Sequence, residues 1–275
     1  MTKFTFTLVQ KIAPRGKYKI TKDLAELLNK HLPKYGINNP KRITLFLANI
    51  LTETGGFRAL EENLNYSAKR IRQVWPSRFS SVAKAIPFAH NPERLANIVY
   101  NRYGNVGHKG WGWKYRGRGF MQTTFVDNYQ KVKDVTGIDV VSNPDLLKDV
   151  EMALIAACIY WKQSGCNALA DAGKIRECRK KVNGGYHGLS TVNSYYRKVL
   201  PLVADIKLDK DVEGVAGGAV VTTVGVGVAQ PTFLLPIIVF GLVALVGVIV
   251  YKKRKRKKDV QQALGFIEGM EDIPD

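Results

Sequence analysis

Apolar residues recur every three or four positions through most of the first two hundred residues, the spacing of helices with one buried face. The pair Asn39-Pro40 is a helix start signal, and the apolar repeat after it runs to Glu53, where Gly55-Gly56 predicts an end. The same criteria predict helices after Thr21, Ser67, Asn91-Pro92 and Asn143-Pro144 and over 152–161, whereas the alternation in residues 4–9 predicts one short strand. The pattern therefore predicts a mainly α domain over residues 1–205.

A continuous apolar run over residues 232–251 sets the end of the chain apart. Its 20 residues carry no charge, and a helix of that length is about 30 Å long, which matches a bilayer core. We expect a single transmembrane helix here rather than a buried core helix. Residues 206–231, rich in Gly and Val, are expected to form a flexible linker, with a second membrane-associated segment at 214–230 as the alternative.

The residues after this span indicate its orientation. Residues 252–258 are all Lys or Arg, and such runs remain on the cytoplasmic side of a membrane. We expect 252–275 to be a basic, then acidic, cytoplasmic-side tail and the N-terminal domain to lie on the opposite, wall-facing side. Residues 1–17 lack the apolar core of a secretory signal, so the sequence does not explain how that domain crosses the membrane.

The net charge of +19 is concentrated in the N-terminal domain. Residues 252–275 contribute +2 and residues 213–251 contribute −1, so residues 1–212 carry +18. A surface this basic attracts polyanions, which include nucleic acid, anionic lipid and the acidic polymers of a bacterial envelope. The four His and three Cys show no zinc-type spacing, and no phosphate-loop or serine-hydrolase motif is present. We therefore predict no metal and no cofactor.

Two glutamates are the candidates for acid–base chemistry. Glu53 ends an apolar helix and Glu62 follows nine residues later, so an unbroken helix would place them on opposite faces. The Gly55-Gly56 break lets the chain fold back, so that the two carboxylates can face each other across a groove. A pair of carboxyl groups in this arrangement catalyses glycoside hydrolysis. Glutamates near a helix end are otherwise usually solvated surface groups, so this pattern alone leaves both interpretations open.

The segment from Gly110 to Thr124 mixes aromatic rings, glycines and arginines. Flat rings such as Trp113 and Tyr115 stack on sugar faces, and an arginine such as Arg118 binds carboxylates. An aromatic plug in the core with arginines at its rim is the alternative interpretation.

Four motifs together resemble a known family: ETGGF from Glu53, EENLNYSA from Glu61, YRGRGFMQTTFVDNY from Tyr115 and VNGGYHGL from Val182. In this order they are similar to motifs of the family 19 glycoside hydrolases, which include chitinases and bacteriophage endolysins. The resemblance covers about residues 43–196. It implies a two-lobed, lysozyme-like helical fold that cleaves β-1,4 bonds next to N-acetylated sugars with inversion.

The resemblance also implies roles for single residues. Glu53 matches the general acid, Glu62 the general base, and Thr124 the hydroxyl that helps hold the attacking water. Gln122, Asn128 and Asn183 match substrate-binding positions, to which we add Trp113, Tyr115 and Arg118 from the residue types. The sequence departs from the family at Thr52, where a histidine is usual, and at Thr123, where leucine is usual. Glu61 adjoins Glu62 and is the alternative base.

These observations predict a membrane-anchored peptidoglycan hydrolase, of viral origin, that cuts the glycan strands of a bacterial wall. Its expected partners are those strands, the lipid bilayer through residues 232–251 and other virion proteins; the saccharide-type motifs do not favour nucleic acid. We expect the anchor to lie in a virion membrane, or alternatively in the host cytoplasmic membrane during lysis. The alternatives for the domain are a chitinase, a lytic transglycosylase and a wall-binding protein without catalysis.

Overall fold

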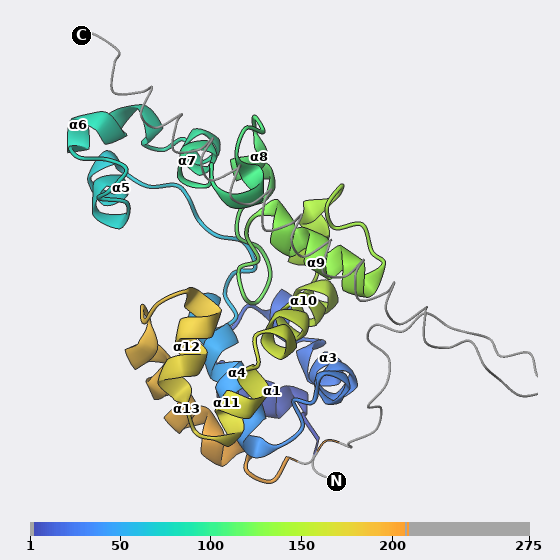
Figure 1. Cartoon of the computed structure of the whole chain (residues 1–275). Helices are drawn as coiled ribbons and strands as arrows, with labels where there is room; N and C mark the ends of the chain where they lie inside the picture. Colours follow the sequence, from blue (N-terminus) through green and yellow to red (C-terminus); the bar gives the residue numbers. More distant parts are fainter. Residues whose placement is uncertain (1–2, 207, 209–275) are drawn as a thin grey trace, which may run out of the picture. The chain divides into compact units, whose positions relative to one another are not determined.

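The computed structural model describes residues 3–206 and 208, and its regular secondary structure is helical (Figure 1). This confirms the mainly α fold predicted from the sequence. The α-helices are α1 (Phe6–Ile12), α2 (Tyr18–Thr21), α3 (Leu24–His31), α4 (Pro40–Glu53), α5 (Ala68–Val74), α6 (Val82–Ala85), α7 (Pro92–Val99), α8 (Trp111–Lys114), α9 (Val126–Thr136), α10 (Val150–Gln163), α11 (Cys166–Asp171), α12 (Ile175–Asn183) and α13 (Leu189–Val203). The 3₁₀ helices are η1 (Pro33–Tyr35), η2 (Ile86–Phe88), η3 (Tyr103–Asn105) and η4 (Pro144–Lys148).

Helix α4 lies at the centre of the main core because it is apolar on nearly every side. All nine residues from Ile43 to Leu51 are buried. The helix packs against α13, α11 and α12, and Phe46 meets Trp161 of α10 edge to face at 5.4 Å between ring centroids (Figure 1). Helix α4 begins where the sequence predicts. The Asn39 side chain caps it by accepting a hydrogen bond from the Arg42 amide, and Pro40 fits the first turn. The catalytic candidate Glu53 thus ends a rigid, buried element.

Two smaller apolar clusters accompany the main core. One gathers residues of α5, α6 and α7, with Trp113 packed against them. The other joins α9, η4 and α10 and includes Tyr115 and Tyr129. Helices α7 and α8 approach so closely that a Cβ on Gly112 would lie 2.4 Å from the carbonyl oxygen of Ala96. The segment 115–125 runs beside the extended residues around Glu62, which places the second and third sequence motifs together.

Two local predictions require correction. Residues 4–9 do not form a strand: Thr5 caps α1 by accepting a hydrogen bond from the Leu8 amide, and the alternation was too short to outweigh this cap. Asn143-Pro144 starts a 3₁₀ turn rather than a long helix. The following α10 begins one turn later, where Asp149 accepts a hydrogen bond from the Met152 amide.

The membrane-related predictions concern residues outside the described part. The predicted span 232–251 and the tail 252–275 lie there entirely, as does nearly all of the predicted linker 206–231. At the boundary, Ile206 and Leu208 are buried against the main core, so the folded domain extends slightly beyond residue 205. Among residues 3–206, no helix combines the length and apolarity that a bilayer crossing requires.

Candidate active site

Glu53 is the last residue of α4, as the sequence predicts. Gly55 and Gly56 have φ angles of 60° and 81°, a left-handed conformation that glycine adopts without strain and that ends the helix. The Glu53 side chain is 16% exposed. It is therefore held at the edge of a rigid helix with limited access to solvent.

The partner of Glu53 is Arg179 of α12, a residue that the sequence analysis did not single out. Its Nη1 donates to Oε1 of Glu53 at 2.5 Å, and its Nε donates to the carbonyl oxygen of His187 at 2.7 Å. Arg179 is 2% exposed, so this ion pair lies largely out of water. The guanidinium joins the Glu53 end of α4 to the loop between α12 and α13.

Glu62 lies in an extended segment and is held by uncharged donors. One carboxylate oxygen accepts a hydrogen bond from the Tyr100 hydroxyl, and the other accepts one from the Gly117 amide, each at 2.6 Å. Burial raises the pKa of Glu62 above its ordinary value of 4.5, and these two hydrogen bonds oppose part of that rise. A carboxylate whose pKa is raised is a stronger base, provided that it is still ionised at the working pH.

Glu61 has a different environment from its neighbour. Its carboxylate pairs with the buried Arg116, and Lys148 lies 4.0 Å away on the other oxygen. Arg116 in turn stacks on the Trp113 ring, with its guanidinium carbon 3.6 Å from the ring centroid. Glu61 is thus engaged with two cations, whereas Glu62 forms no salt bridge with any residue of 3–206 or 208, and this difference favours Glu62 as the base.

Several of the predicted residues form a connected group around Glu62. A Cβ on Gly117 would lie 2.8 Å from Oε1 of Gln122 and 3.3 Å from the Glu62 carboxyl, so both side chains pack against the same glycine. The Thr124 hydroxyl donates to the carbonyl oxygen of Gln122, and the Asn128 side chain donates to that of Thr124, both at 2.8 Å. The chain therefore brings Gln122, Thr124 and Asn128 to the Glu62 side of the site.

Two residues predicted to bind substrate are interior residues instead. Tyr115 is 1% exposed and donates its hydroxyl to the carbonyl oxygen of Val141. Arg118 is 3% exposed, and its guanidinium binds Asp145 and the Tyr129 hydroxyl at 2.9 Å each. Because both side chains are buried and their polar groups are bound within the protein, they stabilise the loop and present no face to a sugar.

The remaining predicted residues are not fully buried. Trp113 is partly buried, with Arg116 over one face of its ring and a backbone hydrogen bond from its amide to the Asn97 side chain. Asn183 is exposed at the end of α12, beside the loop that Arg179 anchors through His187. These positions are compatible with substrate contacts.

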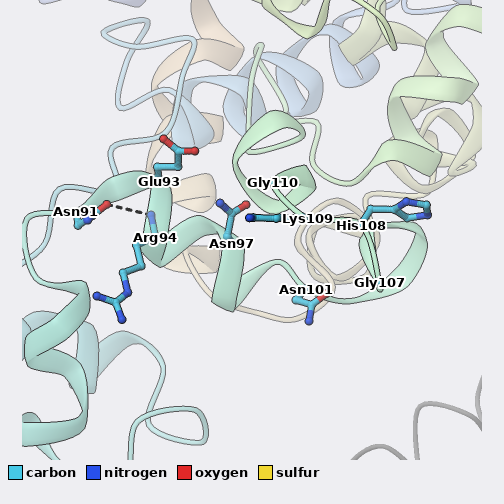
Figure 2. Close-up of a pocket in the computed structure, with 9 residues that line it drawn as sticks. All are labelled: Asn91, Glu93, Arg94, Asn97, Asn101, Gly107, His108, Lys109 and Gly110. Carbon is cyan, nitrogen blue, oxygen red and sulfur yellow. Dashed lines mark hydrogen bonds between the residues drawn. The ribbon is translucent and has the colours of Figure 1, made fainter.

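A hollow of about 590 Å³ lies apart from the two glutamates, between α7 and the residues before α8. Figure 2 shows that its polar side chains diverge: Arg94 points away from Lys109, and the His108 ring points to the far side. Without convergent polar groups, this hollow does not form a second catalytic site. Within residues 3–206 and 208, no cluster of three or more His, Cys, Asp or Glu side chains could hold a metal ion.

Comparison with known proteins identifies the family. The sequence matches no family model. It is 32% identical over 202 residues to a glycosyl hydrolase family 19 domain-containing protein from Haemophilus influenzae, covering 73% of this chain and 96% of that protein. Among solved structures, chitinase C from Streptomyces griseus superposes with a TM-score of 0.52 and 17% identity, over 75% of this chain and 79% of the chitinase. A bacterial family 19 chitinase gives a TM-score of 0.50 and 18% identity, over 74% and 96% of the two chains.

The fold resembles that of these chitinases, and the level of identity to the Haemophilus protein, over nearly its whole length, establishes kinship. This chain is a glycoside hydrolase that belongs to glycosyl hydrolase family 19.

Proposed function

We propose that this glycoside hydrolase is a membrane-anchored peptidoglycan hydrolase that cuts β-1,4 bonds of the wall glycan with inversion. The observation that carries the proposal is the contrast between two carboxylates. Glu53 is paired with one buried guanidinium, and Glu62 is half-buried against uncharged donors with a raised pKa. Two carboxyl groups in distinct environments can take different roles in acid–base chemistry. The motif resemblance, and not the direction of the pKa shift, assigns Glu53 as the acid and Glu62 as the base.

In the proposed mechanism Glu62 is the general base. Its raised pKa suits removal of a proton from water, and Thr124 is assigned to hold that water. Inversion requires a gap of about 6.5–9.5 Å between the two carboxyl groups, which admits the attacking water.

Glu53 is the general acid in this proposal. Arg179 contacts Oε1, and no hydrogen bond among the described residues involves Oε2, which is the oxygen assigned to carry the proton to the leaving group. Once the proton has been given away, the Arg179 guanidinium stabilises the carboxylate that remains. Arg179 is thus a positioning residue for the acid.

The substrate proposal rests on charge. The N-terminal domain carries most of the net +19, and peptidoglycan bears carboxylates that neutral chitin lacks. Chitinase activity is the second candidate, because the similar solved structures are named chitinases.

The decisive experiment offers purified peptidoglycan and chitin oligomers to the full chain and analyses the products by mass. New reducing ends in peptidoglycan fragments support the proposal, and anhydro ends indicate a lytic transglycosylase. Cleavage of chitin oligomers alone supports the second candidate. Activity that survives in Glu53→Gln would contradict the assigned acid, and wall binding by the wild type without any cleavage would leave a wall-binding protein.

The membrane anchor and its location are part of the same proposal. Residues 232–251 anchor the chain, with the N-terminal domain on the wall-facing side, in the membrane of a virion. In a flotation assay, the full chain should rise with the liposomes, whereas a variant that ends at residue 231 should not. Detection in purified virus particles supports the virion location, and detection in lysing cells alone supports the host membrane.

A further inference from the structure

A basic hollow of about 340 Å³ lies beside Glu61, separate from the contacts of Glu62. Three segments wall it: residues 17–20 before and within α2, residues 58–61, and residues 148–150 from the end of η4 to the start of α10. They bring together four cationic side chains, which are Lys17, Lys19, Arg58 and Lys148.

The walls of this basic hollow are held by main-chain hydrogen bonds. The Lys17 amide donates to the carbonyl oxygen of Phe57 at 3.0 Å, which fixes the first segment to the second. The Gly119 amide donates to the carbonyl oxygen of Leu60 at 2.8 Å, which fixes the second segment to the loop that carries Gly117. The cations are therefore gathered by the fold itself.

The charges in the basic hollow are not balanced internally. Its one acidic lining residue, Glu61, is already paired with Arg116, and Lys148 is paired with Asp145 at 2.8 Å. Lys17, Lys19 and Arg58 form no salt bridge among the described residues. Like charges gathered without counter-charges attract an anionic ligand.

The apolar part of the lining narrows the class of ligand. Ile20 and Leu60 of the lining are buried, and Ala59 and Val150 complete its apolar surface. Small aliphatic groups combined with cations suit a short peptide that carries methyl side chains and carboxylates. The volume is too small for a nucleic-acid duplex, whose major groove alone is about 12 Å wide.

We propose that the basic hollow binds the short, carboxylate-bearing peptide branch of the glycan strand, and so selects peptidoglycan over chitin. This inference rests on the proposed function. The backbone connects the two sites, because Glu61 lines the hollow while the next amide, that of Glu62, donates to Gly117 at 3.1 Å. The proposal places the branch in this hollow while the strand that carries it lies at the site.

The test compares three substrates with the full chain: peptidoglycan, the same glycan after enzymatic removal of its peptides, and chitin oligomers. The variant Lys17→Ala/Lys19→Ala/Arg58→Ala removes the three unpaired cations. We expect its kcat/KM on intact peptidoglycan to fall about tenfold, with the value on stripped glycan unchanged, as partly exposed charge contacts are individually weak. The matched control Lys69→Ala/Lys84→Ala/Lys174→Ala removes the same charge from other exposed positions and should retain activity on both substrates.

Equal losses on intact and stripped glycan, or an equal loss in the control, would overturn the inference while leaving the proposed function in place. A binding measurement tests the inference separately from the proposed function. Titration calorimetry with the soluble branch peptide should give heat with the wild type and none with the triple variant. If the wild type binds the peptide but cuts no peptidoglycan, the proposed function fails, and of the inference only the binding of the peptide by the hollow stands. Stronger competition by a phosphate polymer than by the peptide would overturn the inference.

Discussion

Arg179 donates hydrogen bonds both to Oε1 of Glu53 and to the carbonyl oxygen of His187, so one buried guanidinium fixes the end of α4 against the loop after α12. In the sequence, Arg179 is 126 residues from Glu53 and 8 residues from His187. The arrangement gives Arg179 two functions, which are to orient the candidate acid and to stabilise the fold.

Replacement of Arg179 is therefore expected to affect both activity and stability. In Arg179→Met the Glu53 carboxylate loses its partner, and breaking a buried pair costs about 3 kcal/mol of unfolding free energy. Misplacement of the acid should lower activity about 100-fold. Denaturant unfolding and wall-clearing assays measure the two effects.

The control for this prediction is Arg176→Met, which changes an exposed residue of the same helix and should be near neutral in stability. Adding Glu53→Gln to Arg179→Met should restore part of the lost stability, since no unpaired charge then remains. Full additivity of the two single changes would show that the pair is not coupled.

Glu62→Gln is expected to abolish catalysis and to stabilise the protein at neutral pH. Burial raises the pKa of Glu62, so the folded protein retains this proton to a higher pH than the unfolded chain does. The wild type therefore loses stability as the pH rises through that pKa. Glutamine does not titrate, so the stability advantage of the variant should grow over the same range and vanish below the ordinary value of 4.5.

Thermal unfolding of both proteins between pH 4 and pH 8 measures this difference. Activity should fall at least about 100-fold, the usual contribution of a general base. A constant difference in stability across the pH range would contradict the burial of an ionisable carboxyl here. The matched change Glu61→Gln removes a group that is engaged with two cations, and it should not stabilise the protein.

The sequence predicts the position of Glu53 better than it predicts the residues that contact Glu53 and Glu62. The end of α4 at Glu53 follows from Gly55-Gly56, because helix termination is decided by neighbouring residues. The hydrogen bond from Tyr100 to Glu62 spans 38 residues, and no periodic pattern connects them. Arg179 is missed for the same reason, as a lone arginine on a helix is usually a solvated residue.

The segment 110–118 shows why residue type alone is a poor guide to a binding face. Tyr115 and Arg118 have the chemistry of sugar and carboxylate contacts, but here they turn inward to Val141 and Asp145. Alternation along the chain does not reveal this, because Tyr115 and Arg118 follow the short helix α8 in a stretch without regular geometry. The aromatic-plug interpretation is correct for Tyr115, although Arg118 is buried in the interior rather than solvated at the rim.

Tyr100→Phe should shift the pH dependence of the reaction. The pKa of Glu62 is raised by burial and lowered by the hydrogen bond from the Tyr100 hydroxyl, so removing that hydroxyl raises the pKa further. A base must be ionised to act, and the acid limb of the kcat/KM profile should therefore move to higher pH. Well above that limb the rate should fall less than about tenfold.

The matched control for Tyr100→Phe is Tyr103→Phe. Both rings pack against Phe125, but Tyr103 is 67% exposed and does not contact Glu62. Its profile should coincide with that of the wild type. A shift of the acid limb to lower pH in Tyr100→Phe would show that Glu62 is not the base.

Gly112→Ala tests the close approach of α7 and α8. The new Cβ would lie 2.4 Å from the carbonyl oxygen of Ala96 and 2.6 Å from the Cα of Asn97, and backbone cannot move aside cheaply. We expect a loss of about 1–3 kcal/mol, a lower melting temperature and reduced activity. Gly185→Ala meets no atom within 4 Å and should melt like the wild type. Equal melting temperatures for the two variants would contradict this packing.

Gly117→Ala should lower activity with little effect on stability, whereas Gly112→Ala should lower both. The added Cβ would lie 2.8 Å from Oε1 of Gln122 and 3.3 Å from the Glu62 carboxyl. The Gln122 end is flexible and can move, so the melting temperature should change little. Movement of either side chain misaligns groups assigned to water and substrate, and activity should fall at least about tenfold. Differential scanning calorimetry paired with a peptidoglycan assay measures both, and unchanged activity would show that Gln122 and Glu62 do not act together.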